Sequence, residues 1–246
     1  MDSRGKLIVH GLTKKFNRSL EGVEVLDDLS FEINREEIVS ILAPNGYGKT
    51  TLIRIMCGLL RPDKGYVEIN GENIFNHAGV KKNIGVSIDG SKDSYSNFTA
   101  KENIKYFGML MGLSNVEIGL RLEKISKYLN IERILNVRTS KLSRGQRQKL
   151  SIVLGILHNP QYLILDEPTL GLDLKSSQTL SDMLLDMKSD GIGIFLASHD
   201  TNIISKISDR IIFLKNGKVE NTLYGCNLSH DGRELEKVYL NVYDEK

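Results

Sequence analysis

The sequence has no tryptophan, only two cysteines and no long apolar run. Cys57 and Cys226 lie too far apart in the chain to form a metal-binding motif, and so few cysteines favour a reducing compartment. No apolar run approaches the roughly 20 residues that a membrane-spanning helix requires, and the first residues do not resemble a secretion signal. We therefore expect a soluble cytoplasmic protein that reaches a membrane only through another chain.

The chain also lacks a strong excess of charge of either sign. Its 246 residues carry a formal net charge of +2, and 26% of them are charged. No basic patch of the kind that binds nucleic acid stands out in the sequence, so we expect no nucleic acid partner. The length suffices for one large domain or two small ones with a sizeable core.

The most informative segment is residues 43–51, with the sequence Ala-Pro-Asn-Gly-Tyr-Gly-Lys-Thr-Thr. It follows an apolar stretch, Ile38–Leu42, and opens a helical pattern that ends near Gly58. A strand, a glycine loop and Gly-Lys-Thr at a helix start predict a phosphate-binding loop, although a glycine-rich turn could contain Gly-Lys-Thr by chance. The residues expected to contact a nucleotide here are Asn45, Gly46, Tyr47, Gly48, Lys49, Thr50 and Thr51.

The chemistry of this loop follows from its residue types. Backbone N–H groups and the positive end of the following helix attract phosphate oxygens. Lys49 would add a point charge at the outer phosphates, and the hydroxyl of Thr50 would ligate Mg²⁺. Two positions depart from the usual pattern: Ala43 stands where the first glycine is expected, and Tyr47 is larger than the residue expected there.

A second signal lies at Tyr162–Asp166 and the next residue, Glu167. The apolar residues before the two acids predict a strand covered on both faces, as in parallel sheets. Ligands bind at the carboxyl ends of such strands. Asp166 would hold Mg²⁺, and Glu167 would polarise the water that attacks the γ-phosphate. The alternative is that both acids only cap the next helix.

Three further motifs are weaker when each is taken alone. His199 follows the apolar residues 192–197 and would reach a γ-phosphate from the same sheet edge, or would be structural. Phe16 could stack on adenine or belong to the core. Ser143 and the backbone of Gly145 precede an apolar helix expected at 152–157, where Ser143 could bind an anion or simply cap the helix.

The remaining pattern gives a coarse order of elements. Capping boxes beginning at Thr99 and Ser114 predict two helices, and the middle third shows no strand signal. A polar tail beyond residue 225 carries no functional signal. Strands are expected at 6–10, 23–33, 66–70, Ile84–Ile88 and Arg210–Lys215. Helices are expected at 99–111 and 114–129, and a further helix runs from the turn at 171–173 to about residue 188.

Taken in order, the motifs resemble the ATP-binding subunit of an ABC transporter, over about residues 7–222. The likeness includes the signature Leu-Ser-Arg-Gly-Gln at residues 142–146 and the Gly-Leu-Asp turn at 171–173. It implies an α/β fold: a P-loop NTPase core of ABC type with an N-terminal antiparallel β subdomain and a helical subdomain. Residues 1–225 would form the ATP-binding domain, with the helical subdomain inserted at about 92–157 and a C-terminal tail at 226–246.

The resemblance also implies ATP and Mg²⁺ as cofactors, and a homodimer packed head to tail. Each ATP would lie between the phosphate loop of one subunit and the signature of the other. Glu167 and His199 would be catalytic, and Asp173 would communicate between the two sites. The signature residues that reach the γ-phosphate of the partner's ATP would be Ser143, Gly145 and Gln146.

Two departures from the family pattern refine the expected function. Arg144 replaces the first glycine of the usual signature, which resembles exporters whose membrane subunits are separate chains. Asp89 or a neighbour replaces the glutamine that senses Mg²⁺, so we assign that role to Asp89. The expected function is an ATPase at the cytoplasmic face of the membrane that powers a separate integral membrane permease in export. The alternative is a soluble ABC ATPase, such as one in iron–sulfur cluster assembly; a nucleotide kinase or GTPase would leave the signature unexplained.

Overall fold

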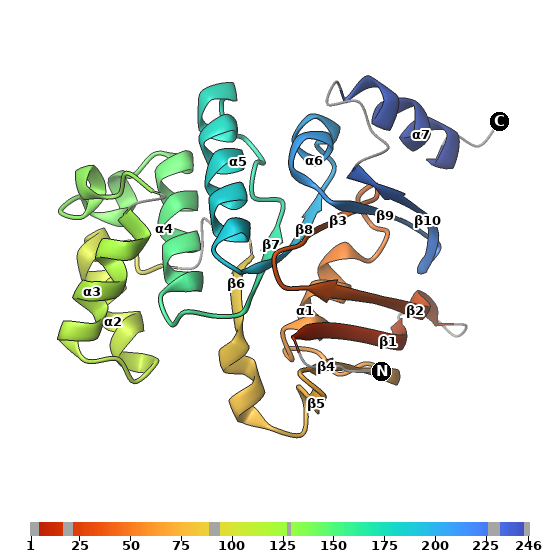
Figure 1. The fold of residues 1–246 in the computed structure, drawn as a ribbon, viewed down its shortest axis with the longest axis horizontal. Helices are drawn as coiled ribbons and strands as arrows, with labels where there is room; N and C mark the ends of the chain where they lie inside the picture. The colour runs from red at the N-terminus through yellow and green to blue at the C-terminus, as the bar shows by residue number, and fades with distance from the viewer. Residues whose placement is uncertain (1–4, 17–21, 89–93, 127–128, 226–231, 244–246) are drawn as a thin grey trace.

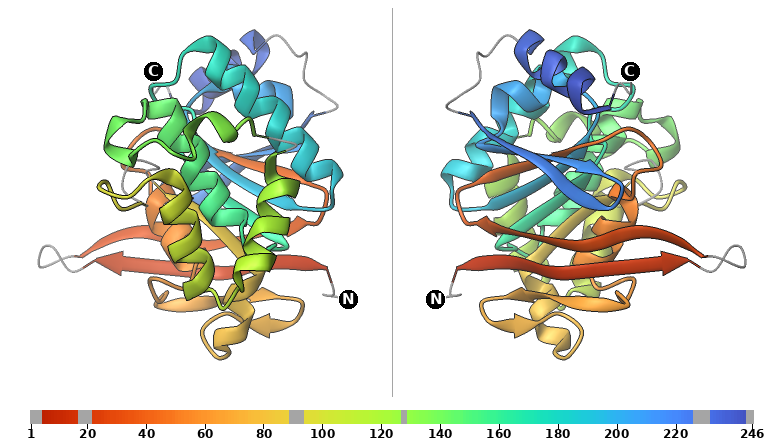
Figure 2. Two further views of the ribbon diagram at one scale, coloured as in Figure 1. Left: turned by 90° about the vertical axis from the view of Figure 1, so that its left-hand side faces the viewer. Right: turned by 90° about the vertical axis from the view of Figure 1, so that its right-hand side faces the viewer.

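The structure is a computed structural model that describes residues 5–16, 22–88, 94–126, 129–225 and 232–243. It contains a four-stranded antiparallel sheet and a six-stranded sheet, with helices packed on both (Figure 1). Figure 2 shows the antiparallel sheet as a layer of its own below the six-stranded sheet. Asp89, which the sequence analysis assigned to Mg²⁺, lies outside the described residues.

The antiparallel sheet is longer at its start than the sequence predicts. The strand expected at residues 6–10 continues to Phe16, so Phe16 ends a strand rather than lying between two. Register shifts after Val9, Leu12 and Lys14 interrupt the alternation of apolar and polar residues that identifies a strand in the sequence. The strands, in spatial order, are β2 (Val23–Asn34), β1 (Lys6–Phe16), β4 (Lys64–Ile69) and β5 (Glu72–Asn73).

The six-stranded sheet carries the loops that matter for function. Its strands are parallel except β10, which returns from β9 through the turn at Asn216 and Gly217. Every residue of β3 and β7 is buried, as expected for strands covered on both faces. The spatial order is β10 (Lys218–Tyr224), β9 (Arg210–Lys215), β3 (Ile38–Leu42), β8 (Gly193–Ser198), β7 (Tyr162–Asp166) and β6 (Ile84–Ile88).

Several helices begin at a residue whose side chain caps them. Both boxes predicted from the sequence form, since Thr99 and Ser114 exchange hydrogen bonds with Glu102 and Glu117. The helix expected at 152–157 begins already at Arg144. Its first turns are polar, so the apolar pattern in the sequence does not mark them. The helices are α1 (Lys49–Met56), α2 (Ala100–Leu110), α3 (Asn115–Ser126), α4 (Arg144–Ile156), α5 (Leu174–Ser189), α6 (Thr201–Ile207) and α7 (Arg233–Tyr243), with 3-10 turns η1 (Ala78–Asn83), η2 (Glu132–Ile134) and η3 (Thr139–Lys141).

Two hydrophobic clusters cover opposite faces of the six-stranded sheet. Leu163 and Leu165 of β7 pack among α2 to α6, whereas Ile164, between them, packs towards α1 and the antiparallel sheet. The carboxyl ends of β3, β7 and β8 therefore open along one edge, and the polar residues that follow them meet there. Within the described ranges, no helix combines the length and the apolar character needed to cross a bilayer.

Candidate active site

The segment that leaves β3 turns sharply before it enters α1. Gly46 and Gly48 have φ values of 89° and 95°, in the left-handed region that favours glycine. A Cβ at Gly48 would also lie 2.9 Å from both the carbonyl oxygen and Cγ1 of Val25. Helix α1 starts at once, with the N–H of Leu52 donating to the carbonyl of Gly48 at 2.9 Å. The unpaired N–H groups of its first turn are therefore presented at the sheet edge, where they can bind an anion.

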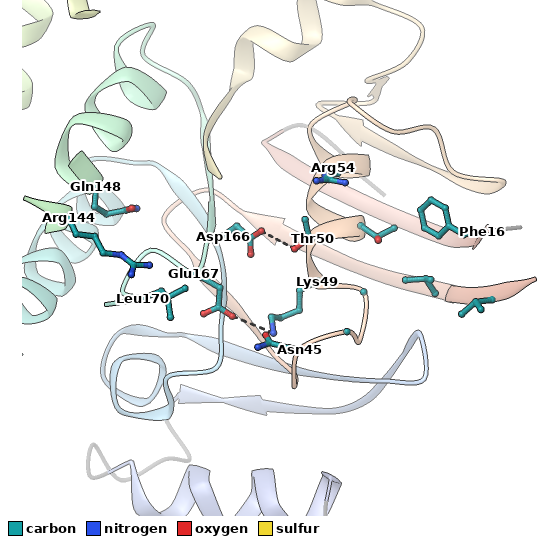
Figure 3. A pocket seen from close by; sticks show the side chains of 15 residues that line it. Phe16, Asn45, Lys49, Thr50, Arg54, Arg144, Gln148, Asp166, Glu167 and Leu170 are labelled. Carbon is teal, nitrogen blue, oxygen red and sulfur yellow. Dashed lines mark hydrogen bonds and ion pairs between the residues drawn. The ribbon is translucent and has the colours of Figure 1, made fainter. Parts of the chain in front are cut away.

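Lys49 is the buried cation of this loop, with 6% of its side chain exposed. Its ammonium donates to the carbonyl of Ala43 at 2.6 Å and to that of Pro44 at 3.3 Å. It also lies 3.4 Å from Oε1 of Glu167, so the one ammonium contacts both the carbonyls of the loop and this carboxylate (Figure 3). A buried ammonium has no water to solvate it, which makes it a strong partner for any phosphate oxygen that replaces these contacts.

Thr50 and Asp166 place two oxygen atoms that could ligate a metal beside Lys49. The hydroxyl of Thr50 donates to Oδ2 of Asp166 at 3.1 Å (Figure 3). Burial raises the pKa of Asp166, and the hydrogen bond from Thr50 opposes this rise. Hydroxyl and carboxylate oxygens are the ligands that Mg²⁺ prefers, and their separation of 3.1 Å would allow both to hold one ion.

Glu167 is fixed by its backbone and by two side chains. Its φ of 46° is unusual for a non-glycine residue, and its N–H donates to the carbonyl of Ala197 at 2.8 Å. Oε2 lies 2.9 Å from Nδ1 of His199, so an ionised carboxylate accepts a hydrogen bond from the ring. Oε1 is buried and, in the described part of the chain, has no hydrogen-bond partner. That oxygen faces the ammonium of Lys49 at 3.4 Å.

These residues line a cavity of about 580 Å³ at the edge of the sheet. At its outer end Phe16 pairs with Val23 across β1 and β2, which gives the cavity an apolar wall (Figure 3). The ammonium of Lys14 lies 5.7 Å from the ring centroid of Phe16. The lining residues predicted from the sequence are Phe16, Asn45, Gly46, Gly48, Lys49, Thr50, Thr51, Asp166 and Glu167.

Sequence reasoning missed several residues of the cavity. Arg54 follows the predicted residue Thr50 by one helical turn, so this spacing could have revealed it. Arg144 was noted only as a departure from the signature, and Gln148 follows it by one helical turn. Val25, by contrast, reaches the loop only through the packing of β2, which no local pattern reveals. The missed lining residues are Val23, Val25, Arg54, Arg144, Gln148 and Leu170.

The other predicted residues lie outside this cavity. Ser143 caps α4 and shares a capping box with Gln146, so its predicted capping role is confirmed. Gly145 faces the start of α5, where a Cβ would lie 3.4 Å from Oγ of Ser176, and Asp173 caps α5 by accepting from the N–H of Ser176 at 2.8 Å. Tyr47 and His199 do not line the cavity either, although His199 contacts Glu167, which does. No cluster of three or more His, Cys, Asp or Glu that could hold a metal occurs among the described residues.

Comparisons with known proteins agree on one family. The family model described as "ABC transporter" matches residues 26–170. The chain is 35% identical to the ABC transporter ATP-binding protein NatA of Bacillus subtilis, over 84% of this chain and 85% of that protein. It is also 35% identical to the SkfA peptide export ATP-binding protein SkfE of Bacillus subtilis, over 88% of each chain. An import subunit is similar too: the cobalt import ATP-binding protein CbiO of Rhodobacter capsulatus is 31% identical over 80% of this chain and 72% of its own.

The solved structures extend this likeness to the fold. The dimeric post-hydrolysis state of an ATP-binding cassette bound to ADP and Pi superposes with a TM-score of 0.79. That chain is 27% identical to this one, and the match covers 89% of this chain and 98% of the other. The similarity therefore includes proteins that bind and hydrolyse ATP as dimers.

Proposed function

Because the chain belongs to the ABC transporter family of ATP-hydrolysing subunits, we propose that it powers a separate membrane permease in the export of a substrate. The observation that carries the proposal is the meeting of Lys49, Thr50 and Asp166 with Glu167 at one sheet edge. In this proposal residues 1–225 are the ATP-binding domain, with a helical part at about 92–157, and 226–246 are its C-terminal segment.

Residues of this chain then divide the work of ATP hydrolysis. Backbone N–H groups at 45–51 and the ammonium of Lys49 bind and orient the phosphates, and Phe16 stacks on the base. Thr50 and Asp166 would hold Mg²⁺, which supplies charge neutralisation at the phosphates. Glu167 takes a proton from the attacking water through Oε1, and His199 orients that carboxylate through Oε2.

Nucleotide binding requires Lys49 to exchange partners. In this structure its ammonium bonds to loop carbonyls and lies near Glu167. A γ-phosphate carries more charge than a carbonyl, so the ammonium turns to the phosphate and leaves Oε1 of Glu167 to the water. In this way nucleotide binding both fills the site and releases Glu167 from its contact with Lys49.

A second subunit completes the site in this proposal. Ser143, Gly145 and Gln146, at the N-terminus of α4, do not line the cavity of their own chain, whereas Arg144 does. The start of this helix is suited to bind an anion. In the dimer it would face the γ-phosphate held by the other subunit. Asp173 lies at the neighbouring helix start and would link the two sites.

The membrane partner is proposed to dock beside β6 and α2. A groove of about 660 Å³ opens there, and we refer to it as the Tyr95 groove. The side chains of Tyr95 and Met111 are 49% and 39% exposed, respectively. Exposed aromatic and Met side chains in one groove suit an apolar helix of another protein. The groove is lined by Ile84, Val86, Ser94, Tyr95, Phe107, Met111, Ser151, Leu154, Gly155 and His158.

The direction of transport is inferred from relatives. SkfE is named for peptide export, and Arg144 in the signature resembles exporters with separate membrane subunits. CbiO is named for import, so the family alone does not fix the direction. We therefore propose export, at the cytoplasmic face of the membrane, with ATP and Mg²⁺ as cofactors.

Cell fractionation followed by purification in detergent tests the proposed partner. The tagged chain is expected in the membrane fraction, together with an integral membrane protein. Met111→Glu places a charge in the Tyr95 groove and should abolish this co-purification with ATP binding unchanged. Tyr224→Glu, at a site 54% exposed on β10, is the matched control. Recovery only from the cytosol with soluble partners would contradict the proposal and favour a role such as iron–sulfur cluster assembly.

A further inference from the structure

The C-terminal helix α7 contacts the phosphate loop through one pair of rings. The ring of Tyr47, the large residue of the loop, packs edge to face on the ring of Tyr243, with centroids 5.5 Å apart and planes at 83°. Both side chains are partly buried, and Tyr243 packs against both hydrophobic clusters. The large side chain of Tyr47 therefore packs against a residue in the last turn of α7.

The hydroxyl of Tyr243 reaches the strand from which the loop departs. It lies 2.8 Å from the carbonyl oxygen of Leu42 and 2.8 Å from that of Leu214. Leu42 is the last residue of β3, directly before Ala43, and Leu214 lies on the neighbouring strand β9. A phenol has one proton, so it donates to one carbonyl at a time or is shared between them. Either arrangement ties α7 to the backbone where the loop begins.

Helix α7 is itself firmly attached to the sheet. Leu235 is fully buried, and the ammonium of Lys215 donates to the carbonyl of Val242 at 2.7 Å, at the negative end of the helix. The helix lies beside α6 at the end of the molecule that carries β9 and β10 (Figure 1). Burial raises the pKa of Tyr243, so its hydroxyl keeps its proton at physiological pH.

We propose that Tyr243 is a positioning residue for ATP hydrolysis, through which α7 sets the geometry of the phosphate loop. Lys49 donates to the carbonyl of Ala43, the residue after Leu42, so a shift of the Leu42 carbonyl reaches the ammonium within one peptide unit. Loss of the contact leaves Tyr47 without its ring partner and the loop with more conformations to lose on binding. The inference rests on the proposed role of this loop in binding phosphate.

The test uses the full chain and two substitutions of Tyr243. Tyr243→Phe keeps the ring and removes the hydroxyl, and it should weaken Mg-ATP binding about threefold to tenfold, the range for one hydrogen bond. Tyr243→Leu also removes the ring contact and should weaken binding more. KM should rise in step with Kd while kcat at saturating ATP stays within about twofold, because Glu167 and His199 are untouched. In a Tyr47→Ala background, the effect of Tyr243→Leu on Kd should shrink, since the two rings act as a pair.

Three comparisons decide the outcome, with calorimetry performed below the melting transition of every variant. Tyr224→Phe, an exposed tyrosine on β10, should leave Kd and KM unchanged. A lower melting temperature with unchanged Kd and KM in both Tyr243 variants would overturn the positioning role, because a purely structural tyrosine behaves in that way. Lys49→Ala separates the two proposals: if it abolishes binding while the Tyr243 variants do not weaken it, the ATP site stands and only this inference fails. Unchanged binding in Lys49→Ala would overturn both.

Discussion

At the scale of single residues, the site depends on one carboxylate with a partner on each side. Glu167 faces the ammonium of Lys49 through Oε1 and the ring of His199 through Oε2. The two contacts hold the carboxylate in one orientation. In the proposed mechanism, transfer of Lys49 to a phosphate removes one of them and leaves Oε1 of Glu167 to the attacking water.

Substitution of this carboxylate should separate binding from chemistry. Glu167→Gln keeps the shape of the side chain and its contact with His199, but an amide cannot accept the proton of the attacking water. We expect kcat to fall at least about 100-fold, the usual contribution of a general base, with Kd for ATP changed by no more than a few fold. Gel filtration with Mg-ATP should then show a stable dimer. A variant that retains wild-type turnover would exclude Glu167 as the base.

His158 should make the stability of the protein sensitive to mild acid. Its Nε2 lies 3.0 Å from the carbonyl of Ile84, while Nδ1 is buried and, within the described residues, has no partner. Burial lowers the pKa of this ring, so the unfolded chain takes up a proton, near the ordinary pKa of about 6.5, before the folded one does. The contribution to the free energy of unfolding is therefore complete above that pH and is lost as the pH falls.

Urea unfolding at two pH values measures this effect. Between pH 7.5 and 5.5, the wild-type protein should lose more stability than His158→Gln, which cannot take up the proton. The other histidines are common to both proteins and cancel in the comparison. Equal losses in the two proteins would show that His158 does not sense the pH.

At the scale of elements, the central strands of the six-stranded sheet were predictable because burial on both faces makes them continuously apolar. Ile38–Leu42 and Tyr162–Asp166 have the predicted bounds, and the loop and acids that follow them could be assigned for the same reason. The end of β1 at Phe16 was not predictable, since its register shifts remove the alternation of buried and exposed residues. The polar first turns of α4 lack the apolar pattern by which the rest of the helix was found. The contacts of α7 depend on neighbours distant in sequence, which no local pattern contains.

Close packing of α4 on β6 gives a test at this scale. A Cβ on Gly155 would lie 2.8 Å from the carbonyl oxygen of Val86, too close without a movement of the helix. Gly155→Ala should therefore destabilise the protein by about 1–3 kcal/mol, despite the better helix propensity of alanine. At Gly119, in the exposed helix α3, an added Cβ would meet no atom within 4 Å. Gly119→Ala should therefore raise the free energy of unfolding by about 0.5–1 kcal/mol. Urea unfolding should show changes of opposite sign; a stabilised Gly155→Ala would contradict the close contact.

At the scale of the whole molecule, the proposed head-to-tail dimer divides each site between two subunits. Arg144 of the signature lines the cavity of its own chain, but Ser143, Gly145 and Gln146 do not. In a head-to-tail dimer each site would take its phosphate loop from one subunit and its signature from the other. The symmetry of such a dimer makes the two sites identical and allows each half-site to be inactivated separately.

Mixing two inactive variants distinguishes a shared site from a site within one chain. Lys49→Ala removes the phosphate loop charge, and Gly145→Asp places a negative charge at the signature, where an acid at the start of α4 also favours the helix. Each variant alone should be inactive. If sites are shared, half of the dimers in an equimolar mixture hold one intact site, so about a quarter of the wild-type ATPase rate should return. If each chain used its own signature, every site in the mixture would carry one defect and no activity would return, although differently tagged subunits still co-purify with Mg-ATP.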